Sequence, residues 1–422
     1  MKRKGTSDLI VGLDIGSSAI RLAVGQLVET GVGGGRELQI IGVAETASEG
    51  VHKGTVGNIE DTVSSVSACL EKLERLVGVP IETVWLGVPG VNASSQISKG
   101  VIAVSKADNE ITREDIERGI ESVRSLSAPL NYSILHIIPQ SFSVDGQPGI
   151  SDPVGMTGIR LEVDARVMLA PTSQVGNFTR SVHRAGLEIN GVVLSSLAMA
   201  DAVLTSKQKE LGVAVINFGG STTGLSVYEE GNMIHTVVLP IGSENITNDI
   251  AIVLRVSIDI AERIKVELGS CFAEAVSKKE ELDLYDFGAT NHEGVKRVFL
   301  SQIIEARVED ILQKIDQELK KIQRSGLLPA GVVIIGGGAK LPGMVELSKK
   351  VLRLPSTLGY PLNIGSVTEK INDLGFSTVI GLVKWGSHNL EQSGTRHPIL
   401  NLKGAVGSML GRLKAGFSNL IP

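Results

Sequence analysis

Two segments of the chain combine glycine with hydroxyl side chains in a pattern that suits the binding of an anionic group. They are GLDIGSSAIRLAVG (12–25) and VINFGGSTTGLSVY (215–228). When Asp14 is aligned with Asn217, Gly16 falls opposite Gly219 and Ser18 opposite Ser221. Two apolar runs around such a turn predict a β-hairpin whose backbone N–H groups can approach a phosphate closely. This similarity between the two segments indicates that the chain has two related halves.

Either segment alone fits a simpler interpretation, because any tight hairpin between two strands needs a glycine turn. Taken together, they predict a phosphate site formed by backbone donors and hydroxyls. The residues that we expect there are Asp14, Gly16, Ser17, Ser18, Asn217, Gly219, Gly220, Ser221 and Thr222.

Two further features lie after the second hairpin. The segment GVVIIGGGAKLPGMVEL (331–347) predicts a buried strand, then Gly336, Gly337 and Gly338, and a helix that Pro342 opens. Such a turn can pack its glycine backbone against a flat ring or a phosphate. The segment AERIK places Glu262 and Lys265 on one helical face. This pair is either a solvated salt bridge or a clamp on ribose hydroxyls and the edge of a base.

Composition limits the class of protein. The chain has 422 residues, 42% of them hydrophobic, which is enough for two or more domains with sizeable cores. A net charge of -5 and 3% aromatic residues argue against nucleic acid as a partner. The isolated Cys69 and Cys271 exclude a disulfide framework and fit a reducing cytoplasm. We expect no signal peptide and no membrane-spanning helix.

The order and spacing of the two hairpins, the AERIK helix and the IIGGGAKLPG turn resemble the nucleotide clamp of the actin, Hsp70 and sugar-kinase superfamily. More narrowly, the chain resembles the FtsA family of bacterial actin-like division proteins along nearly its whole length. The stretches that carry this resemblance are IIGVAETASEGVHKGTVGNIEDTVSSV, LHIIPQSFSVDGQPGISDPVGMTGIRL, LPIGSENITNDIAIVL, PLNIGS and the amphipathic tail.

The resemblance implies an α/β fold of the actin-like, two-lobed type, made of duplicated ribonuclease-H-like domains. We expect a first large lobe, an inserted subdomain, a second large lobe, an outer subdomain, a linker and a C-terminal amphipathic helix. The first large lobe would comprise 8–84, 165–195 and 375–390, and 85–164 would be the inserted subdomain. The second large lobe would comprise 196–243 and 331–374, and 244–330 would be the outer subdomain. The linker would be 391–401 and the amphipathic helix 402–422.

The same resemblance implies that ATP and Mg²⁺ bind between the lobes. Asp14 would position the metal through water, whereas the neutral Asn217 contributes no charge to a cation that prefers oxygen anions. Arg21 matches a basic phosphate-contacting position, although strand alternation could equally direct it to solvent. Ser195 and Ser196 lie where the superfamily has its water-activating residue, and hydroxyls without a partner are poor bases. We therefore expect no catalytic residue and at most weak ATPase activity.

The tail LKGAVGSMLGRLKAGFSNLIP (402–422) predicts a helix that lies in the plane of a membrane. Its apolar residues share one stripe, and its basic residues flank the stripe and can reach lipid phosphates. A core helix or a partner-binding helix would show the same stripe. The residues expected at an anionic phospholipid surface are Leu402, Val406, Met409, Leu410, Arg412, Leu413, Lys414, Phe417, Leu420 and Ile421.

The resemblance also implies the partners and the place of action. An FtsA-like protein polymerises or oligomerises, tethers the division tubulin FtsZ to the cytoplasmic face of the inner membrane at the septum, and contacts other division proteins through 85–164. Arg297 and Arg307 are candidate contacts for the C-terminal tail of FtsZ. The alternatives are a pilus-assembly adaptor of the PilM type and a catalytically active ATPase or kinase of the same superfamily.

Overall fold

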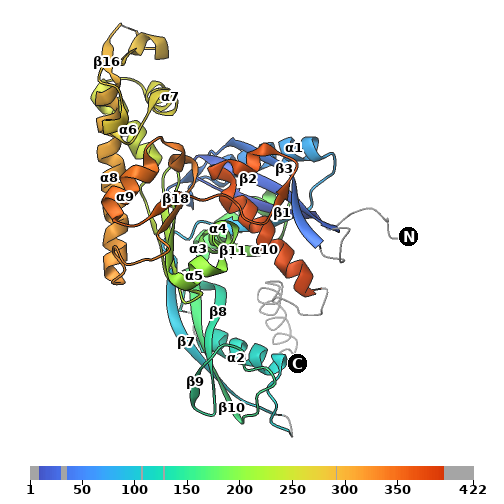
Figure 1. Ribbon diagram of the computed structural model, residues 1–422. Coiled ribbons are helices and arrows are strands. Elements are labelled where there is room, and N and C mark those ends of the chain that lie inside the picture. Colours follow the sequence, from blue (N-terminus) through green and yellow to red (C-terminus); the bar gives the residue numbers. More distant parts are fainter. Residues whose placement is uncertain (1–8, 30–35, 106–107, 127–128, 291, 394–422) are drawn as a thin grey trace, which may run out of the picture.

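The computed structural model describes residues 9–393 apart from 30–35, 106–107, 127–128 and 291. Two central β-sheets lie beside each other, and a smaller subdomain extends from each (Figure 1). One subdomain, around α8, stands at the top of this view, and the other, around α2, hangs at the bottom. The predicted linker beyond residue 393 and the predicted amphipathic helix lie outside the described residues.

The first sheet has six strands, and β1 lies at its centre. The strand order is β11 (Glu188–Leu194), β6 (Thr83–Val88), β1 (Leu9–Ile15), β2 (Ala19–Glu29), β3 (Arg36–Ala47) and β19 (Gly365–Ser366). β1 is antiparallel to β2 and parallel to β6, and β6 is parallel to β11. Three parallel strands therefore end at the same edge of this sheet.

Alternation along β1 directs its side chains to two different layers of helices. Val11 and Leu13 pack with residues of α1 (Ile59–Val77) and α3 (Thr172–Arg184). Ile10 packs on the opposite face with residues of α10 (Ser377–Ser393). Helix α1 ends at Gly78, whose φ of 74° suits glycine. Helix α10 extends three residues into the segment that we expected to be a linker.

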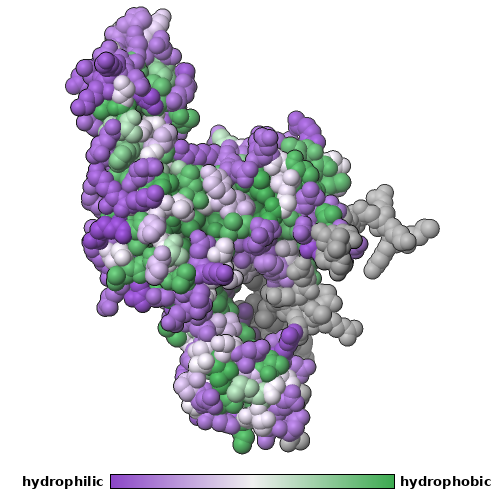
Figure 2. Space-filling view, viewed as in Figure 1, coloured by the Kyte–Doolittle hydropathy of each residue, from purple (hydrophilic) through white to green (hydrophobic). Residues whose placement is uncertain are grey.

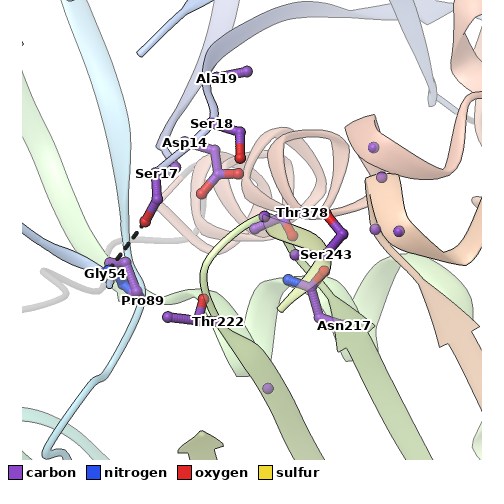
Figure 3. A pocket seen from close by; sticks show the side chains of 18 of the residues that line it. Asp14, Ser17, Ser18, Ala19, Gly54, Pro89, Asn217, Thr222, Ser243 and Thr378 are labelled. Carbon is purple, nitrogen blue, oxygen red and sulfur yellow. Dashed lines mark hydrogen bonds between the residues drawn. The ribbon is translucent and has the colours of Figure 1, made fainter. Parts of the chain in front are cut away.

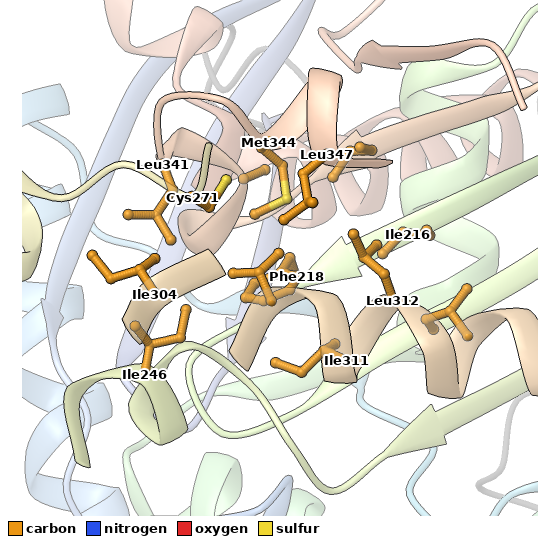
Figure 4. Packing of buried hydrophobic residues seen from close by; sticks show 14 of the residues in the cluster. Ile216, Phe218, Ile246, Cys271, Ile304, Ile311, Leu312, Leu341, Met344 and Leu347 are labelled. Carbon is orange, nitrogen blue, oxygen red and sulfur yellow. The ribbon is translucent and has the colours of Figure 1, made fainter. Parts of the chain in front are cut away.

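The second sheet has five strands in the order β14 (Asn232–Leu239), β13 (Thr223–Glu229), β12 (Val213–Phe218), β17 (Val332–Ile335) and β18 (Ser356–Leu358). Its core lies between the sheet and α8 (Arg297–Lys321). Figure 4 shows Ile216 and Phe218 of β12 pointing toward Ile311 and Leu312 of α8. Helices α4 (Ser195–Val203), α5 (Ser206–Leu211) and α9 (Met344–Leu352) complete this lobe.

The outer subdomain combines the N-terminal part of α8, which is its upper part in Figure 1, with α6 (Ser243–Leu254), α7 (Ile258–Leu268) and the short strands β15 (Glu281–Asp283) and β16 (Gly294–Lys296). Its surface in Figure 2 is mostly hydrophilic, as the charge-rich sequence of α8 predicts. Helix α8 nevertheless buries Leu300, Ile304, Val308 and Ile311 along one side, which fixes it to the subdomain.

The inserted subdomain is a four-stranded sheet in the order β7 (Ser94–Ala103), β10 (Arg160–Pro171), β8 (Tyr132–Val144) and β9 (Gln147–Ile150), covered by α2 (Arg113–Leu126). Its limits differ from the expected range of 85–164. Residues 85–88 belong to β6 of the first sheet, while β10 continues to Pro171 because it pairs with β8 as far as Tyr132.

Two further elements lie outside the expected arrangement. β19, which we expected in the second lobe, pairs with β3 of the first sheet through Gly365 and Ser366. A small hairpin of β4 (Val51–His52) and β5 (Thr55–Val56) precedes α1. No described helix is both long and apolar enough to cross a lipid bilayer.

Candidate nucleotide-binding site

The two glycine turns form the two equivalent hairpins that the sequence predicts. β1 and β2 pair Asp14 with Arg21, and β12 and β13 pair Asn217 with Gly224. In the first turn Gly16 N–H donates to Ala19 C=O at 3.1 Å, and in the second Gly219 N–H donates to the corresponding carbonyl at 2.9 Å. Each hairpin lies in its own lobe, so the two tips approach a common space from opposite sides.

That space is a cavity of about 490 Å³ between the lobes. In Figure 3, Asp14 and Ser18 approach it from one side, while Asn217 and Thr222 approach it from the other. Fourteen of the fifteen residues predicted at the ligand line it. They are Asp14, Gly16, Ser17, Ser18, Arg21, Asn217, Gly219, Gly220, Thr222, Glu262, Lys265, Gly336, Gly337 and Gly338.

Ser221 is the exception. Its side chain is buried and does not belong to the cavity lining, whereas its neighbour Thr222 does. Successive side chains in a tight turn point in different directions, so a run of small polar residues cannot all face one ligand. The phosphate contact through the Ser221 hydroxyl stays a prediction, and this side chain is the one member of the set that does not line the cavity.

Glycine is required where the two hairpins meet. A Cβ atom on Gly220 would lie 1.6 Å from the Ser18 hydroxyl of the other lobe. A Cβ on Gly336, whose φ is 92°, would lie 2.5 Å from Asn217 Oδ1. Both positions allow backbone to come close to the cavity, as the glycine pattern predicts.

Glu262 and Lys265 form an ion pair that is also part of the cavity wall. Lys265 Nζ lies 2.6 Å from Glu262 Oε2 and 2.8 Å from the Thr247 hydroxyl. The Lys265 side chain is only 7% exposed, so its charge is held in place rather than dispersed in solvent. The pair can therefore present fixed polar groups to a ligand that enters between α7 and the Gly336 turn.

Burial raises the pKa of Asp14 to about 6, and the nearby Arg21 guanidinium lowers it only in part. Arg21 lines the cavity, but its Nε also lies 2.5 Å from Glu45 Oε2, and its guanidinium lies 5.6 Å from the centre of the Phe376 ring. A cation bound next to Asp14 would favour the charged carboxylate.

The residues present fit Mg²⁺ only as a metal that arrives with a ligand. The described residues contain no group of three or more His, Cys, Asp or Glu side chains placed to hold a metal. Asp14 supplies one carboxylate, and Asn217 supplies a neutral amide. Magnesium commonly keeps its waters and relies on substrate phosphates in such sites, so phosphate oxygens would supply the remaining negative charge.

Several cavity residues were missed by the sequence analysis. Glu45, Gly54, Pro89, Met199, Ser243, Lys340 and Thr378 also line the cavity. Gly54 comes from the small β4–β5 hairpin, and its N–H donates to the Ser17 hydroxyl at 3.0 Å (Figure 3). Some of them, such as Lys340 in IIGGGAKLPG, lie within the quoted segments, but their approach to the cavity depends on tertiary packing. Asp201, the one carboxylate on α4, does not line the cavity and faces His388 and Lys209.

A second concave surface lies on the outer subdomain between α6 and α8. This surface, which we call the α6–α8 groove, has a volume of about 410 Å³. Its walls are formed by Asp249, Ile252, Val253, Ile303, Ala306 and Arg307.

The two arginines considered as partner contacts differ in their relation to this groove. Arg307 bonds to both carboxylate oxygens of Asp249, at 2.5 and 2.9 Å, and lines the groove. Arg297 instead bonds to Leu268 C=O and Glu280 and does not line it. The two residues are ten positions apart on α8, or about 15 Å along the helix.

Comparison with known proteins agrees with this geometry. The family model "Cell division protein FtsA" matches residues 214–381, and the model "SHS2 domain inserted in FTSA" matches residues 90–169. The cell division protein FtsA of Bacillus subtilis is 36% identical over 390 residues, which cover 92% of this chain and 86% of that protein.

Solved structures support the fold. A PilM-PilN type IV pilus biogenesis complex has a TM-score of 0.61 at 15% identity, covering 89% of this chain and 98% of the other. MreB5 of Spiroplasma citri bound to ADP has a TM-score of 0.54 at 11% identity, covering 93% and 99%. The predicted actin-like α/β fold is thus confirmed. At the level of sequence, the chain belongs to the FtsA family of cell division proteins.

Proposed function

We propose that this protein is an ATP-binding adaptor that joins FtsZ to the cytoplasmic face of the bacterial inner membrane at the division septum. The observation that carries the proposal is the convergence of fourteen predicted nucleotide residues on one cavity between the lobes. They come from β1–β2, β12–β13, α7 and the turn after β17, which are far apart in sequence. ATP with Mg²⁺ would occupy this cavity.

Within the cavity the ligand has a proposed orientation. The two hairpins would hold phosphates through backbone N–H groups and the hydroxyls of Ser17, Ser18 and Thr222. Glu262 and Lys265, fixed on α7, would contact the ribose and the base. Asn217 lacks a charge, and the hydroxyls of Ser195 and Ser196 are poor bases for activating water. ATP therefore serves mainly as a structural ligand, with at most weak hydrolysis.

The α6–α8 groove is the proposed site for the C-terminal tail of FtsZ. Ile252 and Val253 are 75% and 46% exposed there, which leaves apolar area available to a partner helix. Arg307 offers a charged donor at the rim, held in position by Asp249. Arg297 is a weaker candidate on this geometry, because it does not line the groove.

Membrane attachment is proposed from the sequence of residues 402–422. The three basic residues Lys403, Arg412 and Lys414 each add about 1 kcal/mol on an anionic surface, so one tail binds reversibly. Self-association into a filament or oligomer would present several tails together and raise the effective concentration of anchors. The inserted subdomain is the proposed contact for other division proteins.

Equilibrium binding of ATP and GTP tests the nucleotide part of this proposal. In the proposed orientation the full chain with Mg²⁺ should bind ATP more tightly than GTP, because Glu262 and Lys265, fixed on α7, would contact the base. A Lys265→Met variant should lose affinity for both nucleotides while remaining folded. Equal affinity of the native chain for ATP and GTP would contradict the proposed orientation.

A further inference from the structure

Helix α4 begins at the wall of the cavity that Asp14 also lines. Its first residue, Ser195, follows the last residue of β11 without a loop. Because β1, β6 and β11 run parallel, this helix start lies at the same edge of the sheet as Asp14. A Cβ atom on Gly87 of β6 would lie 3.2 Å from Ser195 Oγ and 3.5 Å from Asp14 Oδ1. The hydroxyl and the carboxylate therefore flank the same backbone position.

The first N–H groups of any α-helix have no partner within the helix. The residue before α4, Leu194, has no side chain that could cap them. Its own N–H donates to His136 Nε2 at 3.0 Å, which anchors the preceding strand to the inserted subdomain. The start of α4 is thus anchored, and its first two residues line the cavity, so the positive end of the helix dipole lies at the cavity wall.

Two side chains reinforce this feature independently. Ser195 and Ser196 are 7% and 6% exposed, and both line the cavity. Among the described residues, neither hydroxyl has a hydrogen-bond partner. A buried hydroxyl without a partner lowers stability, so such groups usually have an acceptor that comes from a ligand or a water molecule.

We propose that the N-terminus of α4, with the hydroxyls of Ser195 and Ser196, binds the terminal phosphate of a nucleoside triphosphate. A tetrahedral oxyanion suits this combination of backbone donors, hydroxyls and helix dipole. The inference rests on the proposed binding of ATP and adds the residues that distinguish a triphosphate from a diphosphate. A divalent cation bound with the nucleotide would offset the repulsion between this phosphate and Asp14.

The test compares the affinities of the full chain for ATP and ADP, measured by calorimetric titration with Mg²⁺. Ser195→Ala and Ser196→Ala should each weaken ATP binding about tenfold and leave ADP binding within about twofold. Ser301→Ala is the matched control, because its hydroxyl on α8 is also fully buried and without a partner among the described residues. It should change neither affinity.

Thermal unfolding of the nucleotide-free variants checks that they fold. Each alanine variant removes a buried hydroxyl that lacks a partner, so its melting temperature should equal or exceed that of the native chain. A lower ATP affinity in such a variant then reports a lost contact rather than a damaged fold.

Titration with inorganic phosphate tests whether the site binds the free phosphate ion or only the terminal phosphate of a nucleotide. If phosphate added to the ADP-bound native chain tightens ADP binding, and the serine variants abolish this effect, the site also accepts the free ion, which supports an oxyanion site. If phosphate has no effect while the variants still lose ATP affinity selectively, the site binds only the phosphate attached to the nucleotide, as proposed.

Equal losses for ATP and ADP, or no loss for either, would overturn the inference and leave ATP binding itself intact. If the native chain bound neither nucleotide, both the proposed ATP binding and the inference about α4 would be wrong.

Discussion

The Ser18 hydroxyl donates a hydrogen bond of 3.1 Å to Glu244 Oε1 across the mouth of the cavity. Ser18 belongs to the hairpin of the first lobe, and Glu244 is the second residue of α6, beside the hairpin of the second lobe. Glu244 N–H in turn donates to Gly220 C=O at 2.8 Å. A carboxylate thus accepts the hydrogen bond that the first hairpin would otherwise offer to a phosphate, and it links the two lobes.

Glu244→Gln should speed the association of ATP by about three- to tenfold. The change removes a negative charge at the rim where an anion must approach, and it weakens the link to Ser18. Stopped-flow fluorescence with a labelled ATP measures the rate, and the gain should shrink as salt is added. Glu281→Gln, an exposed acidic residue of the outer subdomain, is the control. An unchanged association rate in Glu244→Gln would show that the contact does not limit entry.

Asp14→Asn should make the nucleotide-free protein more stable at pH 7.5. The pKa of Asp14 is about 6 in the folded protein against 3.8 in the unfolded chain. Unfolding therefore releases a proton between these values, and stability declines as pH rises until both forms are ionised above pH 6. Removing the charge should raise the free energy of unfolding by up to roughly 3 kcal/mol.

Urea unfolding measures that gain, and calorimetry should show that the same Asp14→Asn variant loses the Mg²⁺ dependence of ATP binding. A variant less stable than the native chain at pH 7.5 would mean that Asp14 is not held in an unfavourable environment.

His136 should make the protein sensitive to mild acid. Burial lowers its pKa to about 4, and its Nε2 must remain unprotonated to accept the Leu194 N–H. In the unfolded chain this histidine takes up a proton near pH 6.5. As the pH is lowered from 6.5 to 4, the free energy of unfolding therefore decreases by about 1.4 kcal/mol per pH unit.

His136→Gln keeps an acceptor without a titrating group, so its free energy of unfolding should fall less between pH 7 and pH 5. The native chain should lose about 2 kcal/mol more than this variant over that interval. His52→Gln, an exposed histidine, should behave as the native chain does. Identical pH profiles for native and His136→Gln protein would refute the burial argument.

Arg307→Ala should weaken binding of the FtsZ tail peptide by tenfold or more, because it removes the charged donor of the α6–α8 groove. Ile252→Ser should weaken it as well, since it replaces an exposed apolar side chain of that groove. Arg297→Ala is matched to Arg307→Ala, being on the same helix but outside the groove. Fluorescence anisotropy of the labelled peptide measures all three. A larger effect at Arg297 than at Arg307 would move the site toward the β16 end of α8.

The sequence predicted the cavity well because its motifs are local. A hairpin turn, a helical Glu and Lys pair and a run of three glycines each specify backbone geometry within a few residues. The relation between Asp14 and Asn217 followed from the repeat, and the structure brings both to one cavity.

The misses concern contacts between distant segments. The burial of Ser221, the approach of Gly54 to Ser17 and the joining of β19 to β3 depend on how remote parts of the chain pack. The same holds for Ser195 and Ser196, which the sequence marks only as weak bases. Their value as buried donors at a helix start becomes visible once β11 and β1 are neighbours of β6.

The most direct test of the adaptor function is co-sedimentation of FtsZ with anionic phospholipid vesicles in the presence of ATP. FtsZ should pellet with vesicles when the full chain is present, but not with a chain truncated after Gln392 or with Arg307→Ala. Recruitment that survives both changes would contradict the account, because neither the tail nor the groove would then be needed to join FtsZ to the membrane.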